Sequence, residues 1–354
     1  MKKILKYMIL LFLTLVVVLV GAYFYLISAP SKDSKEVTFT VSEGQTYSTI
    51  GKALKEKGLI RNEIAYKIYI KLNKVGNLEY GSYTLNTNYN IKKMLEIFSL
   101  GSTSKGQTVT VTFKEGLNMR KYIDIISENF DYTQKDVLDK LSDKEYLDTI
   151  INKYWFLTEE IKNKNIYYSL EGYLYPDTYE FYKTASIEDI FKVMLDNMDK
   201  KLTNYKEEIE SSKYTIHQMI TLSSIIELEA GNSNDRKGVA GVFYNRLENN
   251  WSLGSDVTTY YAAKVDLSER DLYKSELNDC NSYNTRAVCM AGKLPVGPIC
   301  NPSIKSIEAS IEPEKHNYYY FVADKNGKTY FNKTDGEHTA TVNKLKKDGL
   351  WFEY

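Results

Sequence analysis

Two glutamates in an apolar segment are the residues of this chain best suited to proton transfer. Glu227 and Glu229 lie in the stretch 221–231, whose other residues are mostly apolar and typical of a helix. At 100° per residue, Glu227 falls within about 20° of Ile216 and Ile220, so its carboxyl group shares a helix face with apolar side chains. Loss of hydration disfavours the charged form of a carboxyl group and raises its pKa. Such a group can donate a proton to a glycosidic oxygen.

The same glutamates have a structural interpretation. A glutamate on a helix is usually exposed or ion-paired, and Arg236 and Lys237 are candidate partners for Glu227. Glu229 is equally hard to dismiss, because Leu222 lies on its side of the helix. The spacing of two residues places the carboxyl groups on opposite sides of the helix. Periodicity alone therefore does not choose between them.

Elements on both sides of this helix could complete a site. The polar segment 232–234 predicts the start of a second helix, whose apolar face runs through Val239, Val242 and Leu247. The segment 253–260 reads as a loop dense in hydrogen-bonding groups, which can bind sugar hydroxyls when a scaffold fixes them. Upstream, glycine and proline interrupt the aromatic segment 169–179, which predicts an ordered loop. Its Glu171 is a candidate second carboxylate or a loop anchor.

Composition excludes several classes of function. The chain has 354 residues, enough for about two domains and an appendage. Its 46 basic and 46 acidic side chains balance, so a nucleic-acid partner is not expected. The three histidines are scattered, and the three cysteines match no zinc pattern, so we expect neither a metal nor another cofactor. The histidines also leave an extracellular protease without a positioned base. A Cys280–Cys289 disulfide is one option, with Cys300 left over.

The N-terminus predicts a membrane anchor. Three lysines within residues 1–6 precede an uncharged run at 7–29 that is long enough to cross a bilayer as a helix. Basic residues on its N-terminal side place that end in the cytoplasm and the rest of the chain outside the cell membrane. A cleaved signal peptide is the alternative, but the apolar run is longer than a usual signal core. Residues 30–36 then read as a linker.

The remaining sequence predicts an α+β fold of two parts. A strand at 37–41, helices beginning near 47 and 62, and a strand at 80–85 resemble a small LysM-like βααβ module, a fold that commonly binds peptidoglycan or chitin. We place this module at 37–105. A larger catalytic domain follows at 106–354.

Motifs spread over the chain resemble the YceG-like family, the MltG endolytic murein transglycosylases. The resemblance covers nearly the whole chain after the linker, and it rests on these blocks in order: Leu170–Tyr179, Ser224–Glu229, Asn245–Leu247, Ser255–Thr258, Tyr283–Thr285, Leu294–Ile299, Asn301–Pro302, Tyr320–Ala323 and Thr334–His338. The chain departs from the family pattern at Val257 and Val296, where proline is common, and at Ser303, where glycine is frequent. These changes could alter loop stiffness, but none removes a proton-transfer group.

The resemblance implies an activity and a set of site residues. Glu227 takes the position of the catalytic general acid, and Glu229 that of a supporting acid. The candidate glycan-binding residues are Arg246, Ser255, Asp256, Thr258, Tyr283, Asn284 and Thr285, each of which could instead hold its own loop. The expected reaction cuts the β-1,4 bond between N-acetylmuramic acid and N-acetylglucosamine in nascent strands and leaves 1,6-anhydro ends. Partners implied are peptidoglycan and the penicillin-binding polymerases. A hydrolytic muramidase and a non-catalytic wall-binding scaffold are the alternatives.

Overall fold

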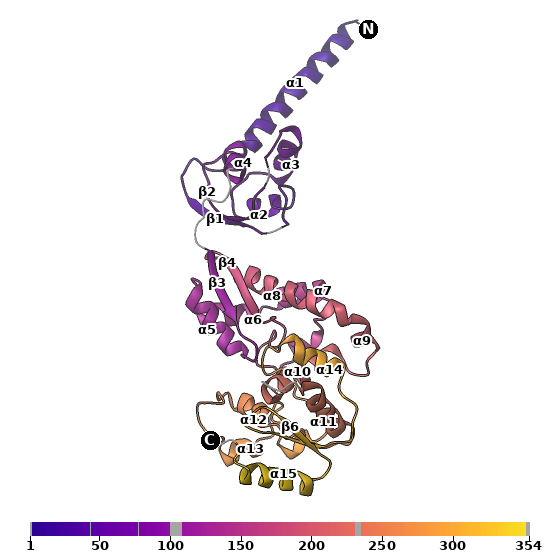
Figure 1. Cartoon of the computed structure of the whole chain (residues 1–354). Coiled ribbons are helices and arrows are strands. Elements are labelled where there is room, and N and C mark those ends of the chain that lie inside the picture. Colours follow the sequence, from indigo (N-terminus) through magenta and orange to yellow (C-terminus); the bar gives the residue numbers. More distant parts are fainter. Residues whose placement is uncertain (1, 43, 77, 100–107, 231–234, 352–354) are drawn as a thin grey trace. The chain divides into compact units, whose positions relative to one another are not determined.

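The structure is a computed structural model of the chain (Figure 1). It describes residues 2–42, 44–76, 78–99, 108–230 and 235–351, except the side chains of residues 2–5 and 9. The predicted helix start at 232–234 therefore lies outside the described residues. The chain divides into two compact units. Unit 1 comprises Met1–Val109 with Phe181–Ala185, and unit 2 comprises Thr110–Glu180 with Ser186–Tyr354.

The chain begins with one long apolar helix, α1 (Lys2–Ile27). Within its segment Lys6–Ile27, an 18-residue window has a mean hydropathy of 2.7, and none of the described side chains in that window is buried within the protein. By length and composition this segment is able to cross a bilayer. The exposed apolar surface of α1 is a candidate membrane anchor, in agreement with the uncharged run in the sequence.

Unit 1 is a two-stranded sheet covered by short helices. Strand β1 (Glu36–Val41) pairs antiparallel with β2 (Gly81–Asn86), and alternation along β1 directs Phe39 and Val41 into the core. The helices are α2 (Gly51–Glu56), α3 (Glu63–Leu72) and α4 (Ile91–Ser99). Sequence analysis missed α4, although its buried residues at 91, 94, 95 and 98 have helical spacing. The βααβ order is present, and α4 follows it.

Unit 2 is mostly helical. In chain order its elements are β3 (Thr108–Phe113), α5 (Met119–Asn129), α6 (Gln134–Leu141), α7 (Lys144–Lys153), η1 (Glu159–Lys162), β4 (Asp177–Tyr182), α8 (Ile187–Leu202), η2 (Thr203–Tyr205), α9 (Lys206–Ser211), α10 (Ile216–Ala230), α11 (Arg236–Glu248), α12 (Asp256–Ala263), α13 (Lys274–Asn278), η3 (Val288–Met290), α14 (Ile304–Ile311), β5 (Tyr320–Ala323), β6 (Thr329–Asn332) and α15 (Asp335–Lys347). Strand β3 pairs with β4, and β5 pairs antiparallel with β6. The first residues of β3 and the last of β4 are assigned to unit 1.

Helix α10 forms the centre of unit 2, where it contacts α11, α12 and α14 (Figure 1). Its side chains are apolar or small on nearly every face, which is typical of a helix surrounded by protein. The hydroxyls of Thr221 and Ser223 donate to backbone carbonyls of the preceding turn. Both side chains are therefore buried with their hydroxyl groups hydrogen-bonded. Two carboxyl groups, those of Glu227 and Glu229, lie in the last turn of this helix.

The loop predicted at 253–260 is wrong from Asp256 onward, where the chain is helical. Helix α12 begins at Asp256, and Ser255 is its N-cap residue. The β-branched residues at 257–259 favour strand or loop by local propensity. Their burial against α10, with Thr258 Oγ1 donating to the carbonyl of Ser255 at 2.7 Å, overrides that preference.

One disulfide closes a loop in unit 2. Cys280 and Cys289 are bonded, which resolves the option left open by the sequence, and Cys300 is a buried free thiol. A crosslink over nine residues restricts the unfolded chain, so it stabilises the folded loop.

We expect the double substitution Cys280→Ser and Cys289→Ser to lower the free energy of unfolding by roughly 2–3 kcal/mol. Urea unfolding of the variant and of the wild type, each with and without reductant, measures this effect. Reductant should destabilise only the wild type. An equal effect on both proteins would contradict the assignment of the bond.

Candidate active site

The Glu227 side chain is buried at 7% exposure, and both of its hydrogen bonds to residues that the structure describes end on one carboxyl oxygen. The backbone N–H of Ser303 donates to Oε2 at 2.9 Å, and the Ser303 hydroxyl donates to the same atom. Ser303 is the N-cap residue of α14, so Oε2 also faces the positive end of that helix. Oε1 lies 3.8 Å from Nη2 of Arg236. The ion pair between Glu227 and Arg236 that the sequence suggested is thus present. The distance between its charged atoms is long, and both side chains are largely buried.

A tightly fixed segment holds Ser303 in place. The Ser224 hydroxyl, one helical turn before Glu227, accepts from the backbone N–H of Ile299 at 3.0 Å. Two backbone hydrogen bonds then tie Asn301 to the segment at Gly116 and Leu117, at 2.9 and 3.0 Å. The donor to Glu227 is therefore fixed by both α10 and the chain leading into α5.

Glu171 lies beneath this segment with 1% of its side chain exposed. Its carboxyl group accepts hydrogen bonds from the backbone N–H of Met119 and the hydroxyl of Tyr261, each at 2.9 Å, and from Nδ2 of Asn301 at 3.3 Å. Burial raises the pKa of Glu171 to about 8, although these donors act in the opposite direction. The loop-anchor interpretation of Glu171 fits this arrangement, because all three partners belong to different segments.

Glu229 faces a different neighbour. Its Oε1 accepts a hydrogen bond from the Ser255 hydroxyl at 2.6 Å, at the start of α12. Burial raises the pKa of Glu229, more than the Ser255 hydrogen bond lowers it. Arg246 contributes positive charge nearby, while its own donors go to the carbonyls of Tyr319 and Leu253 at 2.7 and 2.6 Å. The pKa of the Glu229 carboxyl group is therefore raised.

Most of the predicted glycan-binding residues are inside the protein. Thr258, Asn284 and Thr285 have no exposed surface, and their side chains hydrogen-bond to one another or to nearby residues. Tyr283 is equally buried, and its hydroxyl accepts from the backbone N–H of Tyr167 at 3.2 Å. Ser255 is 3% exposed. In this structure these side chains fix the wall around α10 and present no surface to a ligand.

Asp256 differs from the other predicted glycan-binding residues. Its side chain is 60% exposed and forms an ion pair with Arg286. Arg246 is partly buried and occupied by backbone carbonyls, as described above. Among the predicted glycan-binding residues, Asp256 is thus the most accessible.

A pocket of about 250 Å³ has Leu228, the residue after Glu227 in α10, in its lining. We call it the Tyr260 pocket; it is lined by Gly116, Leu117, Asn118, Lys121, Leu228, Val257, Tyr260, Tyr261, Val265, Asp266, Leu267, Ser268 and Ile299. Gly116, with φ of +76°, separates it from the catalytic candidate: a Cβ there would lie 3.5 Å from Leu228 Cδ2 and 3.8 Å from Glu227 Cγ. The absence of a side chain at Gly116 therefore lets a ligand approach this end of α10 closely.

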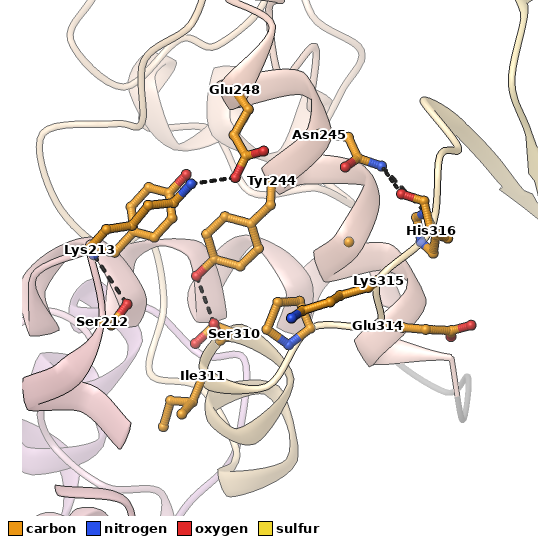
Figure 2. A pocket seen from close by; sticks show the side chains of 13 residues that line it. Ser212, Lys213, Tyr244, Asn245, Glu248, Ser310, Ile311, Glu314, Lys315 and His316 are labelled. Atoms are coloured by element: carbon orange, nitrogen blue, oxygen red, sulfur yellow. Dashed lines mark hydrogen bonds and ion pairs between the residues drawn. The ribbon is translucent and has the colours of Figure 1, made fainter. Parts of the chain in front are cut away.

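A second pocket, of about 340 Å³, lies toward the other end of α10 (Figure 2). It is lined by Tyr214, which precedes α10, and by residues at the end of α11 and after α14. Tyr244 donates to the carbonyl of Ser310 at 2.7 Å, and Lys213 pairs with Glu248 across the opening. Eleven helical steps, or roughly 16 Å, separate Ile216 from Glu227. Neither Glu227 nor Glu229 lines this pocket.

Sequence reasoning missed the partner that matters most to Glu227. Ser303 was singled out only as a departure from the family pattern, and nothing local signals a contact across 76 residues. The block Thr334–His338 has a local structural explanation: Thr334 and Glu337 form a capping box at the start of α15, where each side chain accepts from the other's backbone N–H. Its His338 stacks on Tyr320.

Comparisons with known proteins agree with this architecture. A sequence model described as the YceG-like family matches residues 39–344. The endolytic murein transglycosylase of Bacillus subtilis is 34% identical over 330 residues, which are 92% of this chain and 90% of that protein. The endolytic murein transglycosylase of Streptococcus pneumoniae strain D39 is 30% identical over 90% of this chain and 60% of its own length.

A crystal structure of a yceG-like protein from Listeria monocytogenes matches with a TM-score of 0.61 and 34% identity. The match covers 87% of this chain and all of that one. The family match spans the buried glutamate, the segment that holds it and the helices around them. This chain therefore belongs to the YceG-like family.

Proposed function

We propose that this protein is a membrane-anchored endolytic lytic transglycosylase of peptidoglycan. Relatives aligned over nine-tenths of the chain carry the name endolytic murein transglycosylase. The observation that carries the proposal is the state of Glu227: a buried carboxyl group whose Oε2 is occupied by both Ser303 donors, while Oε1 has only the long contact to Arg236 among the described residues. An acid of this form has one oxygen fixed and one available for proton transfer.

In the first step, protonated Glu227 donates its proton to the glycosidic oxygen between N-acetylmuramic acid and N-acetylglucosamine. Two donors already point at Oε2, so the proton belongs on Oε1. The bond from C1 of the muramic acid residue to this oxygen breaks, and the departing N-acetylglucosamine leaves with a hydroxyl group. The Ser303 donors, the start of α14 and Arg236 then stabilise the carboxylate that remains.

In the second step, the same carboxylate takes a proton from the C6 hydroxyl of the muramic acid residue. The C6 oxygen attacks C1 and closes a 1,6-anhydro ring, so no water is consumed. One residue serves as acid and then as base, and a second carboxylate at a fixed separation is not required, unlike in hydrolytic glycosidases. We assign Glu229, held by Ser255 on the other side of α10, to a supporting role.

The Tyr260 pocket is our candidate for the sugar next to the cleaved bond. Its lining combines apolar groups from α10 and α12 with Tyr260 and the Lys121–Asp266 ion pair at 2.7 Å. Sugars bind where apolar faces are accompanied by a few fixed polar groups. Asp256 is the exposed candidate for direct contact. The buried side chains at 255, 258 and 283–285, by contrast, hold α12 and the loop before it in place against α10.

We place the working part of the chain outside the cell membrane. Helix α1 is the proposed anchor, with the lysines before it in the cytoplasm. The Cys280–Cys289 disulfide fits an oxidising compartment. In unit 1 we propose a LysM-like module that binds glycan strands. An anchored enzyme of this kind would cut strands as the penicillin-binding polymerases extend them.

The products of digestion test the proposed reaction. Purified protein should release muropeptides with 1,6-anhydro ends from isolated sacculi, as identified by mass spectrometry. Reducing ends would instead identify a hydrolytic muramidase. Binding to sacculi without release of any muropeptide would identify a scaffold.

A Ser303→Ala variant tests whether the hydroxyl group of Ser303 tunes the acid. The variant keeps the backbone donor and loses one hydrogen bond that favours the carboxylate form. We expect kcat/KM to fall by about tenfold, because one of the two donors to the carboxylate that remains after the first step is lost. Ser310→Ala, another buried serine of α14, is the matched control and should leave kcat/KM unchanged. An unchanged kcat/KM in Ser303→Ala would contradict the prediction.

A further inference from the structure

Helix α3 presents an apolar stripe that the fold of unit 1 does not use. Ile64, Ile68 and Leu72 are 69%, 42% and 73% exposed. Residues at i, i+4 and i+8 are about 40° apart in turn, so the three side chains lie on one face. Tyr66, about 160° from Ile68 on the helical wheel, lies on the opposite face and is buried in the core. We call the exposed set the α3 stripe.

The α3 stripe begins close to the end of the proposed anchor. Helices α1 and α3 are in contact within unit 1 (Figure 1). Arg61, two residues before α3, donates to the Tyr25 hydroxyl at 3.2 Å, and its guanidinium lies 4.5 Å from the centre of the Tyr25 ring. Ile27, the last residue of α1, packs against the core of unit 1. The start of α3 is therefore level with the last turns of α1, where an anchored helix would leave the bilayer.

Charge on the same face of α3 favours a membrane surface. Lys67 and Lys71 lie beside the α3 stripe on the helical wheel, and Lys74 follows the helix. Glu63 pairs with Lys67 at 2.6 Å and is the one acidic residue of α3. Apolar residues bordered by lysines are typical of helices that lie in the headgroup region of an anionic bilayer. Aromatic and basic residues such as Tyr25 and Arg61 also concentrate at that level.

We infer that the α3 stripe rests on the outer surface of the membrane and forms a second contact beside the anchor. This inference rests on the proposed anchor. Proximity to α1 favours the bilayer over a separate protein as the occupant, because Arg61, two residues before α3, contacts Tyr25 near the end of the proposed anchor. With α1 and α3 both engaged, unit 1 is held in one orientation against the membrane and cannot pivot freely about the end of α1.

The test uses the full chain in vesicles of neutral and anionic phospholipid, with one environment-sensitive fluorophore on an introduced cysteine. The native cysteines are disulfide-bonded or buried, so labelling is specific. Leu72→Cys reports the stripe, and Val17→Cys reports insertion of the anchor. Lys52→Cys, at a side chain 79% exposed on α2, is the control for probes elsewhere on unit 1. Nitroxide-labelled lipids quench any probe that contacts the bilayer.

We expect quenching and a blue shift at Leu72→Cys and Val17→Cys and neither at Lys52→Cys. Adding Ile64→Ser and Ile68→Ser should abolish the signal at Leu72→Cys and leave Val17→Cys unchanged. This result would exclude that the fluorophore alone draws residue 72 to the bilayer. Quenching at Val17→Cys alone would overturn the inference and leave the anchor standing. Loss of quenching at Val17→Cys would overturn the anchor. A Leu72→Cys blue shift without quenching, lost at lower protein-to-lipid ratio, would assign the stripe to a second copy of the chain.

Discussion

Glu227→Gln should abolish release of anhydro-muropeptides, with kcat reduced by about a thousandfold or more. Glutamine keeps the volume of the side chain and can accept both Ser303 donors through its amide oxygen, so the protein should fold. It has no proton to give to the glycosidic oxygen and cannot act as the base for the C6 hydroxyl. Both half-reactions therefore fail together, which explains the size of the expected loss. Product analysis on sacculi and thermal unfolding of the same samples provide the measurement.

Glu229→Gln is the matched control, because it changes the other carboxyl group in the same turn of α10. We expect about a tenfold loss of activity at most, since Glu229 faces Ser255 and not the segment at Ser303. The raised pKa of Glu229 makes it the competing general acid. If the Glu229 variant were inactive and the Glu227 variant active, the two roles would have to be exchanged.

The sequence predicted features that depend on local spacing. Helix α10, the strands of unit 1 and the apolar run of α1 follow from periodicity and length alone. The loop predicted at 253–260 was wrong because its β-branched residues disfavour a helix locally, whereas packing against α10 stabilises one from Asp256 onward. Helix α4, by contrast, was predictable, because its apolar residues at 91, 94, 95 and 98 have helical spacing.

The site itself was only partly predictable. The two glutamates are visible because they interrupt an apolar segment, but their partners come from distant positions. Ser303 reaches Glu227 across 76 residues, and Asn301 reaches Glu171 across 130. The polar residues at 258 and 283–285 looked like ligand-binding groups because their types do not reveal burial. Only the three-dimensional packing shows that their hydrogen bonds are used within the protein.

Substitution of Glu171 should cause a large loss of stability. Glu171→Ala would leave the backbone N–H of Met119 and the hydroxyl of Tyr261 without their buried acceptor, and the amide of Asn301 with the carbonyl of Leu117 alone. We expect a loss of roughly 4 kcal/mol in the free energy of unfolding, measured by urea denaturation. Tyr205→Phe removes one partly buried hydroxyl and is the control, with an expected loss of about 1 kcal/mol.

The pH dependence of stability provides a second test at Glu171, through the volume-conserving Glu171→Gln variant. The pKa of Glu171 is about 8 in the folded protein, whereas an unfolded glutamate titrates near pH ~4.3. Between these values the folded state holds a proton that the unfolded state has released, so its contribution to stability is complete below pH ~4 and is lost as pH rises to about 8. Glutamine does not titrate, so the stability of the wild type relative to the variant should fall across this window. A constant difference would mean that Glu171 is charged throughout, held by its three donors against the cost of burial.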